Sequence, residues 1–428
     1  MSLSPQIIST YEEILKEELV PAMGCTEPIA IAYSSAILQK VLGKRPEKIK
    51  IGLSGNIIKN VKSVIVPATG GMRGIKAAVC AGIVAGCPEK KLEVLSGITD
   101  DNRADISKYN GEHEIEIYEI ETSKPFEIII EGCCEEDFAL VRLADRHTNI
   151  VCVIRNSSDL TRDYLSHEDV HICDTADRSL LNVRDIIEYA DTADISGIKP
   201  LIQRQIDMNM SIAEEGIRSS YGASIGKLLL DSTEGSVRNR ARAYSAAGSD
   251  ARMNGCELPV SIISGSGNQG ITSCVPVVIY GRDMGANEEQ ILRAVIVSDL
   301  ITVHQKTGIG CLSAYCGAIS AGCGCGCGIC YLKGGRYHEI SHTLVNSLAI
   351  LSGTICDGAK SSCAAKIAMA VEAGIMGYEM AKTDREFYGG DGIVTKGVEN
   401  TIRNVGKLAR DGMSGTDKEI IRMMLDAE

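Results

Sequence analysis

The sequence predicts an α+β protein, with a mainly helical body and a smaller mixed α/β unit in its N-terminal half. The period of the apolar residues changes from 3.6 to two near Pro46 and returns to 3.6 after Asn156. The chain has 428 residues, of which 44% are hydrophobic, enough for two or three domains or one large core. We therefore expect residues 46–155 to form the α+β unit, and residues 1–45 together with 156–428 to form a helical body.

The N-terminal segment is expected to form two helices. Residues 4–19 are amphipathic and open at Ser4-Pro5, and the near-continuously apolar run IAIAYSSAILQKVLG ends at Gly43. Thr26 is the expected cap of the second helix, and Cys25 directly precedes it. A helix N-terminus lowers the pKa of a thiol, so Cys25 is either a reactive thiolate or a buried helix-entry cysteine.

Residues 46–155 carry the strand signals. The stretches KIKIGLSGNIIKNV and SVIVPATGGMRG predict a strand, a polar turn, a second strand and a glycine-rich helix start. The turn at Thr69 is a candidate cradle for a small carboxylate, and it lacks a phosphate-loop lysine. Further strands are expected at KLEVLSG, HEIEIYEI, PFEIIIEG and NIVCVIRN, with a short helix over Glu135–Ala144 before the last.

Beyond residue 156 helical patterns dominate again. The segments VRDIIEYA, Ile202–Arg218 and SVRNRARAYSAAGSDAR predict helices, and the last either lines a polar site or forms a solvated face. The stretch PVSIISGSGNQG predicts a buried strand followed by a second candidate anion-binding turn. The remainder is expected to be helical, with a glycine-rich loop at Phe387–Val394.

Composition limits the partners and the compartment. The net charge of −12 argues against nucleic acid or an anionic membrane as a partner. The 17 cysteines do not follow a secreted disulfide pattern and no signal peptide precedes them, so we expect reduced thiols and a cytoplasmic protein. The uncharged run Cys311–Leu332 consists mostly of small residues, so a buried helix is expected there instead of a membrane span.

Cys356 and Cys363 form the first candidate site. On one straight helix, seven residues would separate them by about 10 Å. The Asp357-Gly358 turn breaks such a helix, and Ser361 or Ser362 can cap a new one. Both thiols then meet at a helix N-terminus, where they could bind a metal or an iron–sulfur cluster; alternatively they are core cysteines.

Two further patterns favour packing over metal chemistry. The segment from His338 to His342 matches HExxH, but it opens a helix and no third ligand follows at a suggestive spacing. On an ideal helix one face would hold four cysteines, and Cys325 would point away from it. These four are Cys316, Cys323, Cys327 and Cys330. For Cys323, Cys325 and Cys327 we favour close helix packing, with a second metal site as the alternative.

Several motifs resemble those of the L-cysteine desulfidase family, which is related to the iron–sulfur L-serine dehydratases. They are MGCTEPIAIA, SGNIIKNVKSVIVPATGG, SGSGNQG, GIGCLSAYCGAISAG and GTICDGAKSSC, in the same order over essentially the whole chain. The resemblance implies a [4Fe-4S] cluster, one per subunit and open to loss in air, bound by Cys316, Cys356 and Cys363. It also implies Cys25 as the proton acceptor. Cys311, Cys323, Cys325, Cys327 and Cys330 widen the choice of third ligand.

The resemblance further implies β-elimination of sulfide from a small amino-acid substrate, L-cysteine, giving pyruvate, ammonia and sulfide. The polar turns supply candidate substrate-binding residues, each of which could equally serve only its turn. They are Asn56, Lys59, Asn60, Thr69, Ser264, Ser266 and Asn268.

Three other functions are weighed, together with the assembly. L-serine dehydratase would use the same chemistry with loss of water. A pyridoxal-phosphate lyase lacks a recognisable lysine motif here. A non-enzymatic iron–sulfur redox sensor would need a DNA-binding or partner module, and the acidic remainder of the chain offers none. A homodimer is the assembly that we consider.

Overall fold

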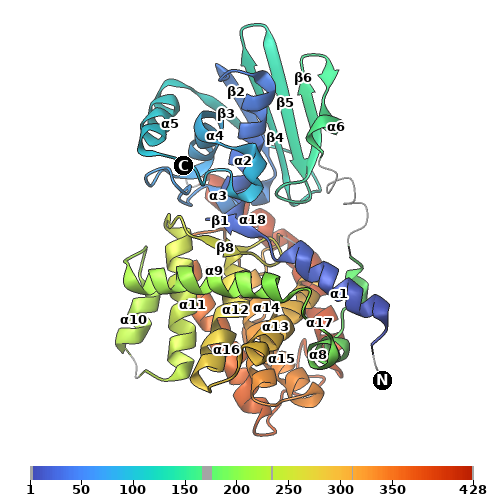
Figure 1. Ribbon diagram of the computed structural model, residues 1–428. Coiled ribbons are helices and arrows are strands. Elements are labelled where there is room, and N and C mark those ends of the chain that lie inside the picture. The colour runs from blue at the N-terminus through green and yellow to red at the C-terminus, as the bar shows by residue number, and fades with distance from the viewer. Residues whose placement is uncertain (1–2, 166–175, 233–234, 311, 427–428) are drawn as a thin grey trace.

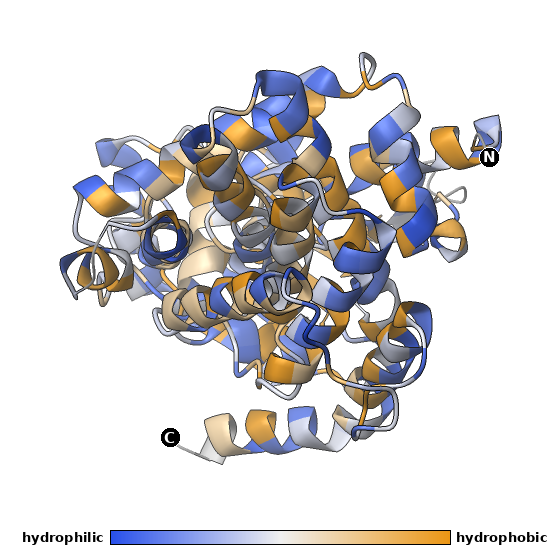
Figure 2. Ribbon diagram, turned by 90° about the horizontal axis from the view of Figure 1, so that it is seen from below, coloured by the Kyte–Doolittle hydropathy of each residue, from blue (hydrophilic) through white to orange (hydrophobic). Residues whose placement is uncertain are grey.

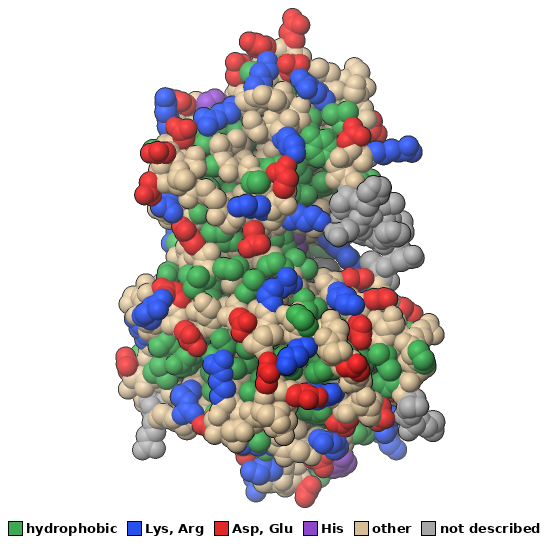
Figure 3. Space-filling view, viewed as in Figure 1, with side chains coloured by type: hydrophobic (Ala, Val, Ile, Leu, Met, Phe, Trp, Pro, Cys, Tyr) green, Lys and Arg blue, Asp and Glu red, His purple; other side chains and the backbone are tan. Residues whose placement is uncertain are grey.

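The computed structural model describes residues 3–165, 176–232, 235–310 and 312–426, and it has two parts (Figure 1). A mixed sheet with helices forms the upper part, and a larger body of helices forms the lower part. The space-filling view shows an elongated molecule that narrows where the two parts meet (Figure 3). The α+β class is therefore confirmed.

The upper part is built on a six-stranded sheet in the order β3-β2-β4-β5-β6-β7. Strands β2 and β3 pair in parallel, and all other neighbours are antiparallel. Helix α2 packs against β4 and β5 as well as against α4, which in turn contacts α5. The strands are β2 (Lys48–Leu53), β3 (Ile115–Glu119), β4 (Glu127–Cys134), β5 (Asp137–Ala144), β6 (Ile150–Arg155) and β7 (Ser158–Asp159). The helices of this part are α2 (Thr26–Leu42), α3 (Gly55–Val61), α4 (Gly74–Ala85), η1 (Pro88–Glu93), α5 (Asp100–Glu112) and α6 (Thr161–Tyr164).

The lower part is organised around α14, which packs against four other helices, α12, α13, α15 and α16. A Cβ atom on Gly326 of α14 would lie 2.4 Å from the carbonyl oxygen of Gly374 on α16, so only small residues allow this approach. The helices of this part are η3 (Arg178–Leu180), α8 (Val183–Thr192), α9 (Lys199–Arg218), α10 (Ile225–Ser232), α11 (Val237–Met253), α12 (Gly267–Asp283), α13 (Glu288–Ile309), α14 (Gly317–Leu332), α15 (Tyr337–Leu351), α16 (Cys363–Ala381), α17 (Val398–Lys407), η4 (Leu408–Gly412) and α18 (Ser414–Asp426).

The cysteine-rich run packs inside this body. Cys323, Cys325, Cys327 and Cys330 are all buried on α14, which agrees with the packing interpretation. Within the described part of the chain, no helix is both long enough and apolar enough to cross a membrane.

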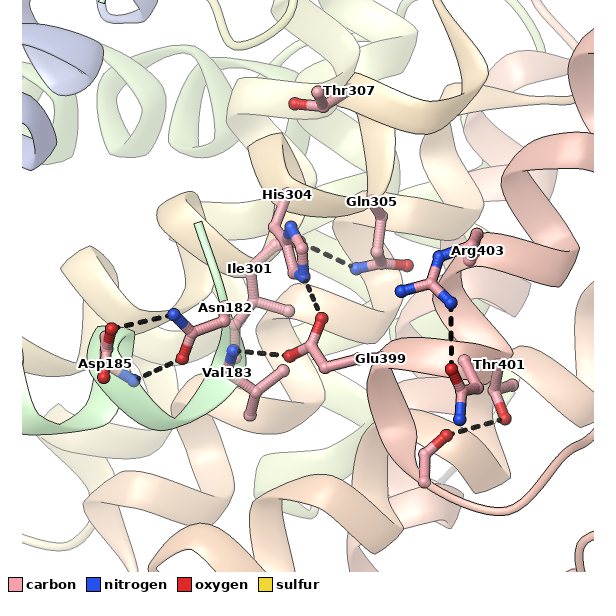
Figure 4. Close-up of polar contacts among 12 residues, drawn as sticks. Asn182, Val183, Asp185, Ile301, His304, Gln305, Thr307, Glu399, Thr401 and Arg403 are labelled. Atoms are coloured by element: carbon pink, nitrogen blue, oxygen red, sulfur yellow. Dashed lines mark hydrogen bonds and ion pairs between the residues drawn. The ribbon is translucent and has the colours of Figure 1, made fainter. Parts of the chain in front are cut away.

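Three connections join distant segments. Strand β1 (Pro21–Met23) pairs antiparallel with β8 (Pro259–Ser261), and α1 (Pro5–Glu18) lies over the lower body (Figure 1). Glu399 on α17 accepts hydrogen bonds from the backbone N–H of Val183 (2.8 Å) and pairs with His304 Nε2 on α13 (2.7 Å), which ties three helices together (Figure 4). Viewed from below, α18 lies apart from the other helices of the body (Figure 2), and it packs against α3 of the upper part.

Several local predictions were wrong. The expected helix at Glu135–Ala144 is strand β5, because its alternating side chains complete the sheet beside β4. The expected polar turn at SGNIIKNV is helix α3, and the expected second strand in SVIVPATGG is a loop with one isolated bridge, Ile65 to Arg73. The expected strand at KLEVLSG overlaps a 3-10 helix and a turn.

The domain boundaries near residues 46 and 156 stay a prediction. The packing of helix α2 differs from the assignment that we made for it. Helix α2 lies within residues 1–45, which we assigned to the helical body, but it packs on the sheet. Its apolar surface runs almost all the way round, so it can be buried between β4, β5 and α4.

Candidate functional site

A cavity of about 100 Å³ lies where the upper and lower parts meet. Cys25, Cys316, Cys356 and Cys363 all line it, although they come from segments far apart in the sequence. Five of the predicted substrate-binding residues line it as well, namely Asn56, Lys59, Asn60, Ser266 and Asn268. This volume can hold a molecule the size of several waters, and it is too small for a nucleotide.

Cys316 and Cys356 are brought together by a short antiparallel pairing. The N–H of Cys316 donates to Thr354 O (3.1 Å), and the N–H of Cys356 donates to Ala314 O (2.6 Å). The Cys316 thiol hydrogen-bonds to Cys356, which lowers the pKa of Cys356 to about 6 despite burial. The positive charge of Lys59 acts in the same direction.

The turn between Cys356 and Cys363 is held against α3. Gly358 has a φ of 94°, and a Cβ there would lie 2.3 Å from the carbonyl oxygen of Lys59, so this position favours glycine. Cys363 is the first residue of α16, as its predicted place in the first turn requires. Its sulfur lies 3.8 Å from Gly358 O, and burial raises the pKa of its thiol.

Cys25 occupies the N-cap position of α2, where Thr26 was expected, and it is 2% exposed. The prediction of a lowered pKa was wrong for this structure. Burial raises the pKa of Cys25 well above its usual value, and the neighbouring Glu27 carboxylate raises it further. These two effects exceed the influence of the helix N-terminus, so Cys25 is a thiol that donates to Glu27 Oε2 over 3.1 Å.

Glu27 is the centre of a buried polar network. Its Oε1 accepts from Asn60 Nδ2 (2.9 Å), and the hydroxyl of Thr26 lies 3.1 Å from its Oε2. Although burial alone would raise it, the pKa of Glu27 is lowered by His147, by the hydrogen bond from Cys25 and by Arg252. Glu27 is therefore an ionised carboxylate that accepts the hydrogen bond of the Cys25 thiol.

The lysines of the cavity wall have partners of their own. Lys59 Nζ lies 2.5 Å from Asp417 Oδ1 on α18 and 3.4 Å from Cys356 O. Lys366 pairs with Asp357 at 2.6 Å. Lys306 also interacts with a neighbouring group. Lys59 is thus placed to support the Cys356 loop.

Thr69 and Ser264 are not on the wall of this cavity. The buried Thr69 hydroxyl donates to Val66 O within its own turn (2.7 Å). Ser264 instead lines a second cavity of about 540 Å³, which shares Lys306 and Leu312 with the first. The larger cavity therefore adjoins the cysteine-lined one.

The charged and amide side chains of the wall that the sequence did not single out are Glu27, Arg252, Gln269, Lys306 and Lys366. The position of Glu27 two residues after Cys25 was an available signal, because a carboxylate there can reach the thiol. The helix that carries Arg252 was predicted, with a polar-site role as one alternative.

Three thiols on one wall fit the donor set of an iron–sulfur cluster, and two lie at helix N-termini that favour negative charge. Within the described ranges, no three His, Cys, Asp or Glu side chains meet closely enough to bind one metal ion. A cubane does not need such a meeting, since each thiolate binds a different iron. In the HExxH-like segment, His342 pairs with Glu386 and the side chain of His338 is largely exposed.

Comparison with known proteins places the chain in a serine dehydratase-like class. Residues 89–422 match the family described as serine dehydratase alpha chain. A UPF0597 protein of Desulfitobacterium hafniense is 51% identical over 428 residues, covering 100% of this chain and 99% of the relative. A UPF0597 protein of Treponema denticola is 45% identical over 430 residues, covering 99% and 100%. The chain belongs to this serine dehydratase-like UPF0597 family.

Proposed function

We propose that the protein is a [4Fe-4S]-dependent L-cysteine desulfidase, a cytoplasmic lyase that releases sulfide by β-elimination. The observation that carries the proposal is the cavity lined by Cys25 together with Cys316, Cys356 and Cys363. Membership in a serine dehydratase-like family supports the lyase chemistry.

Cys316, Cys356 and Cys363 would hold the cluster. When bound through three thiolates, a cubane leaves one iron open, and an open iron acts as a Lewis acid toward a substrate heteroatom. The Cys356 loop is supported by Lys59 Nζ at Cys356 O and by Lys366 at Asp357, so positive charge already faces the thiolates.

Cys25 would take the proton from the substrate Cα. Cys25 must be a thiolate to do so, and the positive charge of Arg252 favours that state because it lowers the pKa of the thiol. The network around Glu27 holds that carboxylate in place, with Asn60 on one oxygen and Thr26 on the other. Loss of sulfide then gives aminoacrylate, which hydrolyses to pyruvate and ammonia.

L-Serine dehydratase is the second candidate, because the matching family carries that description. The test is an anaerobic assay of pyruvate from both amino acids, with sulfide measured for L-cysteine. Preferential sulfide release supports the desulfidase. Pyruvate from L-serine alone would replace it with the dehydratase, and turnover of neither would contradict both.

A further inference from the structure

The cavity wall contains buried polar atoms that have no protein partner. Among the described residues, four are amide oxygens and one is a guanidinium nitrogen. The oxygens are Asn56 Oδ1, Asn60 Oδ1, Asn268 Oδ1 and Gln269 Oε1, and the nitrogen is Arg252 Nε. Buried polar atoms normally have hydrogen-bond partners, so five orphans around one small cavity indicate a bound molecule with both donors and an acceptor.

Arg252 is the exceptional member of this set. Its residue is 2% exposed, and no hydrogen bond or ion pair to its guanidinium occurs within the part of the chain that the structure describes. Its positive charge acts on the proposed base and its neighbour, because it lowers the pKa of Cys25 and the pKa of Glu27. A buried unpaired cation costs much free energy unless an anion joins it.

The guanidinium is also held in a fixed place. A Cβ on Gly267 would lie 2.4 Å from Arg252 Nε, so the first residue of α12 packs directly against it. The N-terminus of this 17-residue helix adds a further preference for negative charge at the same wall.

The other cations of the wall have partners. Lys59 contacts Asp417, Lys366 pairs with Asp357, and Lys306 has an interaction of its own. The orientation of Asn60 is fixed as well, because its Nδ2 donates to Glu27 and its Oδ1 is left as an acceptor.

We propose that Arg252 binds the α-carboxylate of the substrate and that the orphan amide oxygens of the same wall accept hydrogen bonds from its α-ammonium group. This inference deepens the proposed function and rests on it, because it makes the cavity specific for a zwitterionic α-amino acid. The side chain of the amino acid is left to face the three ligand cysteines, and Cα faces Cys25.

The test uses anaerobically purified protein and three unreactive probes, with binding measured by calorimetry. L-Alanine has both charged groups but no leaving group, L-alaninamide lacks the carboxylate, and propionate lacks the ammonium. The parent should bind L-alanine at least about 10-fold more tightly than L-alaninamide, because a charged hydrogen-bonded pair is lost. Arg252→Met should weaken L-alanine binding about 10- to 100-fold and remove this preference.

Arg238→Met is the matched control, since Arg238 lies on the same helix but pairs with Glu372 and does not line the cavity. It should leave L-alanine affinity unchanged and lower the melting temperature. Because Arg252 lowers the pKa of the buried Glu27 carboxylate, its loss should lower the melting temperature as well, so affinities are compared on variants that are folded at the assay temperature. Arg252→Lys keeps the charge but not the planar group, so its affinity for L-alanine should lie between those of the parent and Arg252→Met. This variant replaces Arg252→Met in the test if the methionine variant does not fold.

The outcomes separate the two proposals. If Arg252→Met binds L-alanine as tightly as the parent and still prefers it to L-alaninamide, the carboxylate assignment is overturned while an amino-acid lyase stands. If the parent binds neither L-alanine nor propionate and turns over neither L-cysteine nor L-serine, the proposed function fails as well.

Discussion

Asp299 lies in the middle of α13 with no exposed surface, and its Oδ1 accepts a hydrogen bond from Gln205 Nε2 at 3.1 Å. Its Oδ2 has no hydrogen-bond partner among the described residues. Burial raises the pKa of Asp299 from 3.8 to about 7. The folded state therefore binds the Asp299 proton more tightly than the unfolded state, and stability falls as the pH rises from about 4 to about 7.

The replacement Asp299→Asn removes this pH dependence while keeping the shape. Between about pH 5 and pH 7 the folded parent keeps the Asp299 proton while the unfolded chain has released it, so the free energy of unfolding falls over about two pH units. At about 1.4 kcal/mol per unit, this loss is roughly 3 kcal/mol. For 428 residues, an unfolding entropy of about 2 cal/mol/K per residue converts this to a change of roughly 3 °C in melting temperature. The melting temperature of Asp299→Asn minus that of the parent should therefore increase by roughly 3 °C from pH 5 to pH 8.

Differential scanning calorimetry at the two pH values measures this growth, with the exposed Asp231→Asn as the control that should show none. An Asp299→Asn variant whose melting temperature differs from the parent by the same amount at both pH values would refute the reasoning. Asp299 would then be ionised in the fold, and burial would not dominate its titration.

Three further predictions concern the site. Cys25→Ser should keep the absorbance of the cluster and lose nearly all elimination activity, whereas Cys363→Ser should lose both; cluster loss in Cys25→Ser would instead make Cys25 a ligand. Glu27→Gln keeps the shape but removes the negative charge that raises the pKa of Cys25, so the rising limb of the pH–rate profile should move to lower pH, and an unchanged profile would exclude this effect. Gly358→Ala forces a Cβ to 2.3 Å from Lys59 O at a positive φ, so stability should fall by at least about 1 kcal/mol, with less iron bound per chain; parent-like melting and iron content would contradict the role of this turn.

The sequence predicted the class of the fold because apolar periodicity is a local property. It failed where pairing partners decide the structure. The segment DFALVRLA has helix-forming residues, but as β5 it fills the place between β4 and β6, and that place is set by residues outside it. The same holds for α2, whose all-round apolar surface indicated burial but not which part of the molecule would bury it.

For the site as well, local motifs predicted the wall residues, whereas contacts between distant residues could not be predicted. Motif resemblance led to the four cysteines, and the polar turns led to Asn56, Asn60, Ser266 and Asn268, all on the cavity wall. Lys59 looked equally suited to a substrate carboxylate, yet it pairs with Asp417, 358 positions away in the sequence. Arg252 looked like one of several arginines on a polar helix, and its lack of a hydrogen-bond partner among the described residues sets it apart.

The raised pKa of Cys25 follows from a similar combination of distant segments. A helix N-terminus favours a thiolate, but it acts on Cys25 alongside the burial of the thiol and the charge of Glu27. Glu27 stays ionised through His147 and Arg252, which come from other segments of the chain. The proposed base and the proposed cluster ligands also lie on different parts, since Cys25 precedes α2 of the upper part while Cys316 and Cys363 precede or begin helices of the lower one. Because the cavity exists only where these parts meet, the distance from the base to the ligands is set by contacts such as Gly358 against Lys59 O, and no local pattern encodes it.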